Sequence, residues 1–141
     1  MKRKLVEESS KIHRAVREAH AGERAEDYCE AVVELIRKVG EARLTKIASA
    51  LGVSHVSALR VFRRLQREGL VLLQPYRAIE LTKDGIALAK RAAARHKVVY
   101  EFLRAIGVSH RNASLDAEGI EHHVGAESLK VFKRFVSNHV N

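Results

Sequence analysis

Two helical stretches separated by one glycine, over residues 44–68, constrain the fold of this chain most. The sequence predicts a short helix over 44–51, a tight turn at Gly52 and a longer amphipathic helix over 54–68. At ~100° per residue, four apolar side chains of the longer helix lie within about 100° of one another. These four are Ala58, Val61, Phe62 and Leu65. A short helix, a glycine turn and a longer amphipathic helix form the pattern of a helix-turn-helix.

The opposite side of the longer helix is basic. An isolated basic helix is more often a solvated surface, but the short helix before it and a hairpin after it favour DNA recognition here. The N-terminal residues Ser54, His55 and Ser57 stand where a recognition helix meets base edges. The predicted phosphate- and base-facing arginines are Arg60, Arg63, Arg64 and Arg67.

Two short apolar strands are predicted over 70–74 and 78–81, around the single proline. They form a hairpin, or wing, whose basic tip residue Arg77 is predicted to touch phosphate or the minor groove. The chain also has a formal charge of +9 and a sequence pI near 10.1. This surplus suits a polyanion such as DNA, although it would also suit an anionic membrane surface.

The remaining sequence is predicted to be helical, so the fold class is mainly α. Further helices are expected over 23–39, 82–105, 109–123 and 126–139, with Gly40 and Gly107 as stops. The division predicted is a charged N-terminal arm over 1–22, a winged helix-turn-helix over 23–82 and a helical domain over 83–141. With 141 residues and 5% aromatics the core is small, and dimerisation commonly completes such cores.

Cellular location follows from three observations. No apolar run approaches the ~20 residues needed to span a bilayer. The N-terminus lacks the apolar segment of a secretion signal. The single cysteine, Cys29, fits a reducing compartment and is expected to be a buried thiol that binds no metal. The expectation is a cytoplasmic protein without a membrane partner.

Carboxylates and imidazoles recur at helical spacing. Glu118, Glu121 and His122 are related by i, i+3 and i+4, which predicts one shared helical face. Asp27 and Glu30 stand at i, i+3 on the first predicted helix. Each group alone is commonly a solvated face, and periodicity does not show that the helices meet. His96, on the long helix over 82–105, is by itself more often a core or surface histidine.

The chain resembles the manganese-responsive, short members of the diphtheria toxin repressor family. The segments that carry the resemblance are Glu26-Asp27-Tyr28-Cys29-Glu30, Arg95-His96 and Asp116-Ala117-Glu118-Gly119-Ile120-Glu121-His122-His123. The resemblance implies a homodimeric repressor that binds double-stranded operator DNA, with dimerisation and metal binding in the helical domain. It also implies a binuclear metal site with the ligands Asp27, Glu30, His96, Glu118, Glu121 and His122.

The donor types agree with that implication. Four carboxylates and two imidazoles suit a hard, roughly octahedral divalent ion better than a structural zinc site. The iron-responsive branch of the family has methionine where Asp27 stands and cysteine where Glu118 stands. The expected cofactor is therefore Mn²⁺, two ions per subunit, with Fe²⁺, Co²⁺ or Zn²⁺ able to occupy the site in vitro.

Other readings stay open at this point. They are an iron-responsive regulator of the same family and a metal-independent winged-helix DNA-binding protein. A di-metal oxidase would need two Glu-x-x-His motifs, which the chain lacks, so no enzyme activity and no small-molecule substrate are expected.

Many family members have a proline in the first turn of the recognition helix, where this chain has His55-Val56. His123 is turned away from His122 on the predicted helix and is left out of the ligand set. The other histidines, His13, His20, His110 and His139 among them, have no partner pattern and are predicted to be surface residues.

Overall fold

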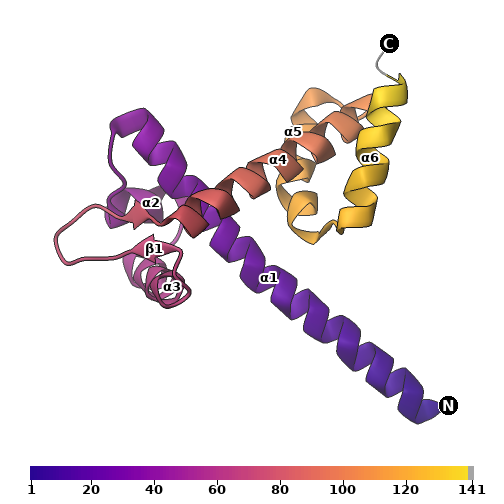
Figure 1. The fold of residues 1–141 in the computed structure, drawn as a ribbon, viewed down its shortest axis with the longest axis horizontal. Coiled ribbons are helices and arrows are strands. Elements are labelled where there is room, and N and C mark those ends of the chain that lie inside the picture. The colour runs from indigo at the N-terminus through magenta and orange to yellow at the C-terminus, as the bar shows by residue number, and fades with distance from the viewer. Residues whose placement is uncertain (140–141) are drawn as a thin grey trace.

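A computed structural model describes residues 1–139, apart from the side chains of residues 19 and 21. The last two residues of the predicted domain 83–141 therefore lie outside the described residues. The fold is mainly α, as predicted, with one antiparallel hairpin (Figure 1). The elements in chain order are α1 (Lys2–Val39), α2 (Leu44–Leu51), α3 (His55–Arg67), β1 (Val71–Leu72), β2 (Glu80–Leu81), α4 (Lys83–Ala105), α5 (His110–Ile120), the 3₁₀ helix η1 (Glu121–His123) and α6 (Ala126–His139).

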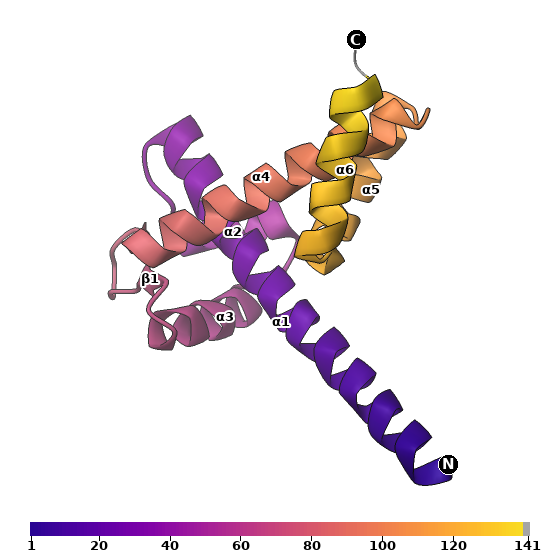
Figure 2. The same ribbon diagram turned by 45° about the vertical axis from the view of Figure 1, so that its right-hand side comes forward.

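Helix α1 is one continuous helix of 38 residues. The predicted helix start at residue 23 is wrong, because residues 2–22 form the first half of α1. No proline interrupts this stretch, and Gly22 is accommodated inside the helix. The first half projects away from the rest of the molecule in both ribbon views, and Leu5, Ile12 and Val16 on it are exposed (Figures 1 and 2). At its other end α1 stops as predicted at Gly40, whose φ of +90° suits glycine.

The second half of α1 packs with α2, α3 and the hairpin to form what we call the reading unit, residues 25–89. Its centre is the fully buried Phe62 of α3, which meets Tyr28 of α1 edge-on at a ring-centroid distance of 5.2 Å. Ile47 of α2 and Leu65 of α3 are also fully buried. The apolar side predicted for α3 is the side that packs, so the helix-turn-helix lies on a closed core.

The wing is shorter than predicted, with only Val71–Leu72 paired to Glu80–Leu81. The start of α4 is hydrogen-bonded to the base of this hairpin. The Thr82 hydroxyl donates to the Gly69 carbonyl at 2.6 Å and accepts from the Gly85 N–H at 3.1 Å, which caps α4 as predicted. Gly85 is required here because a Cβ at this position would lie 2.1 Å from the Leu70 carbonyl oxygen.

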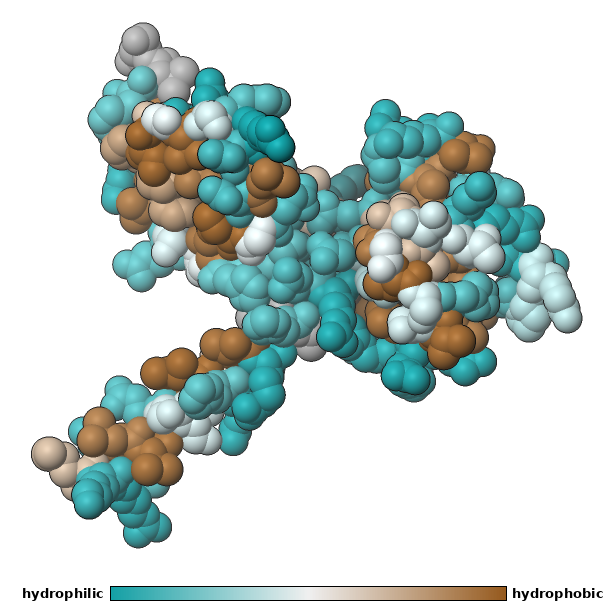
Figure 3. Space-filling model, turned by 180° about the vertical axis from the view of Figure 1, so that it is seen from behind, coloured by the Kyte–Doolittle hydropathy of each residue, from teal (hydrophilic) through white to brown (hydrophobic). Residues whose placement is uncertain are grey.

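Helix α4 crosses α1 and continues into the C-terminal helical unit, residues 90–139, where it contacts α5 and α6. Phe102 of α4 stacks on Phe132 of α6 at 4.0 Å and meets Phe135 edge-on at 5.6 Å. No residue of α6, which is described throughout, is buried. Apolar surface gathers on this unit in Figure 3, and its exposed large apolar residues are Ile106, Leu115, Ile120 and Val131.

Within the part of the chain that the structure describes, no helix is both long enough and apolar enough to cross a bilayer.

Candidate metal centre and nucleic-acid surface

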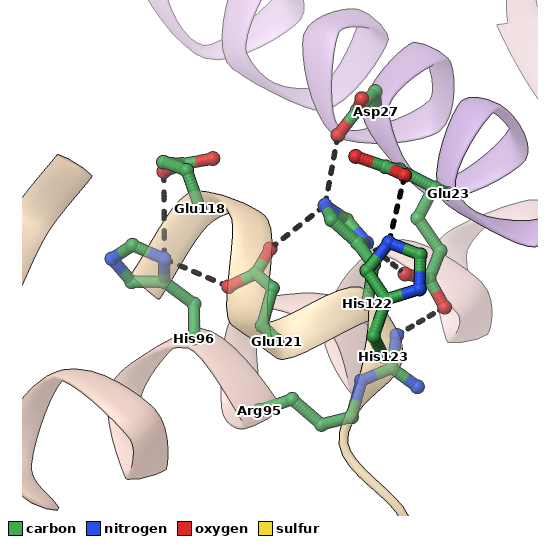
Figure 4. Close-up of polar contacts among 9 residues, drawn as sticks. Glu23, Asp27, Arg95, His96, Glu118, Glu121, His122 and His123 are labelled. Carbon is green, nitrogen blue, oxygen red and sulfur yellow. Dashed lines mark hydrogen bonds and ion pairs between the residues drawn. The ribbon is translucent and has the colours of Figure 1, made fainter. Parts of the chain in front are cut away.

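A cluster of carboxylates and imidazoles lies where α1 passes over α4, α5 and η1 (Figure 4). The first group in it contains His96 of α4, Glu118 of α5 and Glu121 of η1. The His96 Nδ1 atom is 2.7 Å from the Glu121 Oε2 atom and 3.4 Å from the Glu118 Oε1 atom. One ligand atom from each of the three residues lies within 4.8 Å of the other two, a spacing at which one metal ion can be held.

A second group adjoins the first and adds ligands from α1. The His122 Nε2 atom is 3.1 Å from Asp27 Oδ1 and 3.3 Å from Glu121 Oε1. Glu23, which the sequence analysis did not single out, also belongs to this group, since ligand atoms of Glu23, Asp27 and His122 lie within 4.8 Å of one another. Glu121 contacts both groups through its two oxygens, so the carboxylate links them.

The division into two groups corrects one prediction. Glu118, Glu121 and His122 were expected on one face of a helix over 109–123, but α5 ends at Ile120 and continues as η1. The tighter 3₁₀ turn changes the angle between successive side chains. Glu118 therefore points toward His96, whereas His122 points toward α1 (Figure 4).

The cluster is short of positive charge. Burial first, and then the neighbouring carboxylates of Glu30 and Glu118, raise the pKa of Glu121 to about 8. Burial, and then the carboxylates of Glu118 and Asp27, raise the pKa of Glu30 to about 7. Burial also raises the pKa of Asp27, with the His122 imidazole opposing it. Glu30 is the one predicted ligand that belongs to neither group of ligand atoms, and its carboxylate acts on the cluster through its charge.

The polar atoms in the middle of the cluster lack hydrogen bonds. Glu121 is 1% exposed, and both of its carboxylate oxygens are buried without a hydrogen-bond partner among the described residues. The His96 Nδ1 atom is likewise buried, and its short contact with Glu121 lacks hydrogen-bond geometry. Unpaired buried polar groups of this kind are costly unless something else satisfies them. The donor set and its unsatisfied atoms therefore fit a divalent cation.

A supporting pair of residues escaped the sequence analysis. The buried carboxylate of Glu26 forms an ion pair with Arg95 and contacts the Nδ1 atom of His122. This contact leaves the Nε2 atom of His122 directed at Asp27 and Glu121, which is how carboxylates commonly orient metal-binding histidines. Glu26 and Arg95 stand in the motif segments quoted above, but only the crossing of α1 and α4 brings them together.

Cys29 is fully buried in the core of the reading unit, as expected. Burial, and then the negative charges of Glu30 and Glu26, raise the pKa of its thiol to about 11. A protonated buried thiol is a poor metal ligand.

The predicted DNA-facing residues lie on the exposed side of α3 and at the tip of the wing. Ser54, His55, Ser57, Arg60, Arg63, Arg67 and Arg77 are all exposed. Arg64 is the exception: 29% of its side chain is exposed, and its Nε atom lies 3.5 Å from Glu68. The prediction that Arg64 shares the exposed basic face is wrong, because at ~100° per residue it adjoins Val61 at the edge of the packed side.

A surface hollow of about 730 Å³ separates α3 from the wing, and His55, Arg63 and Arg77 line it. Arg43 holds the wing tip by donating from Nη1 to the Tyr76 carbonyl at 3.2 Å. Ser54 caps α3 by accepting from the Ser57 N–H at 3.1 Å. The result is an ordered basic surface made of one helix and one hairpin.

Comparison with family models divides the chain in two. Residues 20–79 match the iron dependent repressor N-terminal DNA binding domain. Residues 82–140 match the iron dependent repressor metal binding and dimerisation domain.

Named relatives match over most of the chain. It is 44% identical over 134 residues to the transcriptional regulator MntR of Escherichia coli O6:H1, covering 95% of this chain and 86% of the relative. It is 38% identical over 104 residues to the HTH-type transcriptional regulator MntR of Bacillus subtilis, and the match covers 74% of this chain and 73% of the relative.

Solved structures share the fold. The manganese regulator SloR superposes with a TM-score of 0.69 at 25% identity, over 80% of this chain and 53% of that chain. The IdeR protein of T. acidophilum superposes with a TM-score of 0.67 at 26% identity, over 80% of this chain and 52% of IdeR. The chain thus spans about half the length of these solved proteins.

Proposed function

Because this chain belongs to the iron-dependent repressor family and is a metal-dependent transcriptional repressor, we propose that Mn²⁺ activates it as a cytoplasmic homodimer that binds operator DNA. The observation that carries the proposal is that α1, α4, α5 and η1 supply two adjoining groups of ligand atoms, which are linked through the unpaired carboxylate of Glu121. The six predicted ligands are Asp27, Glu30, His96, Glu118, Glu121 and His122.

The choice of Mn²⁺ rests on the donor atoms. Asp27 contributes to one group and Glu118 to the other, and both supply oxygen where the iron-responsive branch supplies sulfur. Mn²⁺ is a hard ion and prefers carboxylate oxygens, whereas thiolates and thioethers favour softer ions. Two adjoining groups that share Glu121 support two ions per subunit. The manganese regulator SloR, which shares the fold at 25% identity, supports the same ion.

The bound ions would supply positive charge between elements that otherwise repel each other. Asp27 and Glu30 belong to α1, which packs in the reading unit, whereas Glu118 and Glu121 belong to the C-terminal helical unit. Burial raises the pKa values of Glu30 and Glu121 most, and repulsion between the carboxylates raises them further and opposes close approach of the two units. Neutralising it fixes α1 against α4 and η1.

The recognition helix adjoins that junction in two places. Tyr28, next to Asp27 in α1, packs on Phe62 in α3. Asp27 also lines a hollow of about 500 Å³ together with Ser57 and Arg60, two of the predicted DNA-facing residues. In a homodimer, fixing each α3 sets the separation of two recognition helices, which must match half-sites about 34–36 Å apart. A coupling of about 1–3 kcal/mol would raise DNA affinity ~5–150-fold.

The test is fluorescence anisotropy with labelled promoter DNA, titrated with Mn²⁺, anaerobic Fe²⁺ and Zn²⁺ at matched salt, against a chelator control. We expect Mn²⁺ to raise the affinity ~5–150-fold. We expect Asp27→Ala and Glu121→Ala to lose that increase. Glu101→Ala serves as the matched control, since Glu101 is a surface carboxylate of α4 paired with Lys97. Equal DNA binding in chelator and Mn²⁺, or wild-type metal dependence in Glu121→Ala, would contradict the proposal.

The same assay tests the DNA surface and the metal selectivity. If the dimer contacts about six phosphates, the logarithm of the DNA association constant should fall with a slope near −5 against the logarithm of the salt concentration. The double variant Asp27→Met with Glu118→Cys should respond to softer ions more strongly than the wild type does. Unchanged preference for Mn²⁺ in the double variant would argue against these two ligand assignments.

A further inference from the structure

A further group of side chains adjoins the cluster, between the projecting half of α1 and η1, and shares Glu23 with it. His20 and Glu23 of α1 and His123 of η1 line an open surface hollow of about 670 Å³, together with Asp116. The predicted ligand set includes none of these four residues. The Glu23 carboxylate and the His123 ring face each other in Figure 4.

The three side chains are neighbours, joined pairwise through His123. The His123 Nε2 atom is 3.1 Å from the Glu23 Oε2 atom. The His20 and His123 rings lie 5.3 Å apart between centroids, tilted at 55°. His20 and Glu23 stand at i, i+3 on α1, so both side chains leave the helix on the side that faces His123. His20 lies on the surface, as predicted, but it has a ring neighbour in His123, which the sequence did not indicate.

We propose that His20, Glu23 and His123 form an outer metal site that binds Zn²⁺ or a similar borderline-soft divalent ion. Two imidazoles and one carboxylate, with water completing the tetrahedron, are a common zinc donor set. The side chains of Glu23 and His123 are 28% and 39% exposed, so the ion can enter from solution. The oxygen-rich inner cluster has twice as many carboxylates as imidazoles, so the two sites differ in the ion that they favour.

Glu23 gives the outer site a connection to the inner one. Its carboxylate also lies within 4.8 Å of ligand atoms of Asp27 and His122. A Glu23 carboxylate held by an outer ion is no longer available to that group. Zinc in the outer site would also tie the projecting half of α1 to η1, directly beside the element that carries Glu121 and His122.

The test compares zinc and manganese binding by equilibrium dialysis with elemental analysis, on the full chain at fixed pH. The variant is His20→Ala with His123→Ala, and His13→Ala is the matched control because His13 is an exposed histidine earlier on α1. We expect the double variant to bind about one Zn²⁺ fewer per chain than the wild type, with unchanged Mn²⁺ binding. Co²⁺ provides a spectroscopic check, since the visible absorption of a tetrahedral site should be lost in the same variant. Thermal unfolding of the metal-free proteins verifies that both variants fold.

The outcomes separate this proposal from the proposed function, on which it does not depend. Wild-type zinc stoichiometry in the double variant would overturn the outer site. Zinc loss that is equal in His13→Ala and in the double variant would overturn it as well. Loss of outer zinc in a chain whose DNA binding ignores Mn²⁺ would support the outer site and contradict the proposed function.

Discussion

The two halves of this molecule are stabilised differently. Among the described residues, the reading unit buries Phe62, Leu65 and Ile47 completely. Beyond residue 89, the buried apolar residues are three alanines and one valine, Ala92, Ala113, Ala117 and Val99. Large side chains contribute most apolar area to a core, so the reading unit has a complete core and the C-terminal helical unit does not. The contrast fits the proposed homodimer, in which a second copy would cover part of the second half.

The largest expected effect comes from truncating one aromatic side chain in each half. Phe62→Ala should lower the free energy of unfolding by about 3–5 kcal/mol, because it leaves a cavity in a closed core. Its cost should be the same at every protein concentration. Phe132→Ala removes a half-buried ring of α6, which packs mainly on α4, so its cost should grow where dimers dominate. Urea unfolding at several protein concentrations measures both.

That comparison fails if Phe132→Ala destabilises the chain as strongly as Phe62→Ala at every concentration. Such a result would mean that the C-terminal helical unit is held together within one chain.

The next effect concerns the junction between the halves. Glu26→Gln removes the charge that orients His122 and pairs with Arg95, but keeps the size of the side chain. Metal affinity should fall ~10–100-fold, as is typical when the partner of a metal-binding histidine is changed. Isothermal titration calorimetry with Mn²⁺ measures the change. Glu41→Gln, at an exposed carboxylate paired with Arg43, is the control, and equal affinity in both variants would remove the proposed role of Glu26.

The pH dependence of the stability of the metal-free protein tests the junction between the two halves in another way. The folded-state pKa of Glu121, about 8, lies above its ordinary value of 4.5, so the folded chain retains a proton that the unfolded chain has released. The stability of the metal-free chain should therefore fall as pH rises from about 5 to 8. Saturating Mn²⁺ should reverse the trend, because metal ligands must be deprotonated. Urea unfolding in chelator and in Mn²⁺ checks the sign, and Glu121→Gln should flatten the decline. A metal-free chain that gains stability over this range would contradict the account.

The smallest effect compares two helix caps. Ser54 and Ser109 each accept a backbone N–H at the start of α3 and α5. Replacing either by alanine should cost ~1 kcal/mol. Ser54→Ala should have the same effect at every concentration, since α3 lies in the closed core. A cost for Ser109→Ala that rises with protein concentration, measured by the same unfolding assay, would strengthen the contrast, and an identical profile for both variants would weaken it.

Much of the architecture could be predicted because it is encoded locally. Helical periodicity and the stops at Gly40 and Gly52 located α2 and the end of α1, and the Thr82 cap located the start of α4. The start of α1 was missed because residues 2–22 have only a weak apolar stripe, and such a stripe does not separate a solvated helix from an irregular arm. The change from α5 to η1 was missed because it depends on tertiary contacts of Glu121 and His122.

The candidate site was predictable in its residue types but not in its grouping. Spacing on one helix located Glu118, Glu121 and His122, and the resemblance added Asp27, Glu30 and His96. The roles of Glu23, Glu26 and Arg95 could not be derived in that way, because their partners lie on other helices. A charged residue beside a predicted ligand is the one sequence signal that pointed to Glu26 and Arg95.

The close approach of Gly85 to the Leu70 carbonyl gives α4 a mechanical role. With no side chain between them, the first turn of α4 and the base of the wing must move as one rigid body. A helix of 23 residues is about 34 Å long, and His96 lies near its midpoint. A tilt of α4 at His96 would therefore be carried along the helix to the hairpin that carries Arg77.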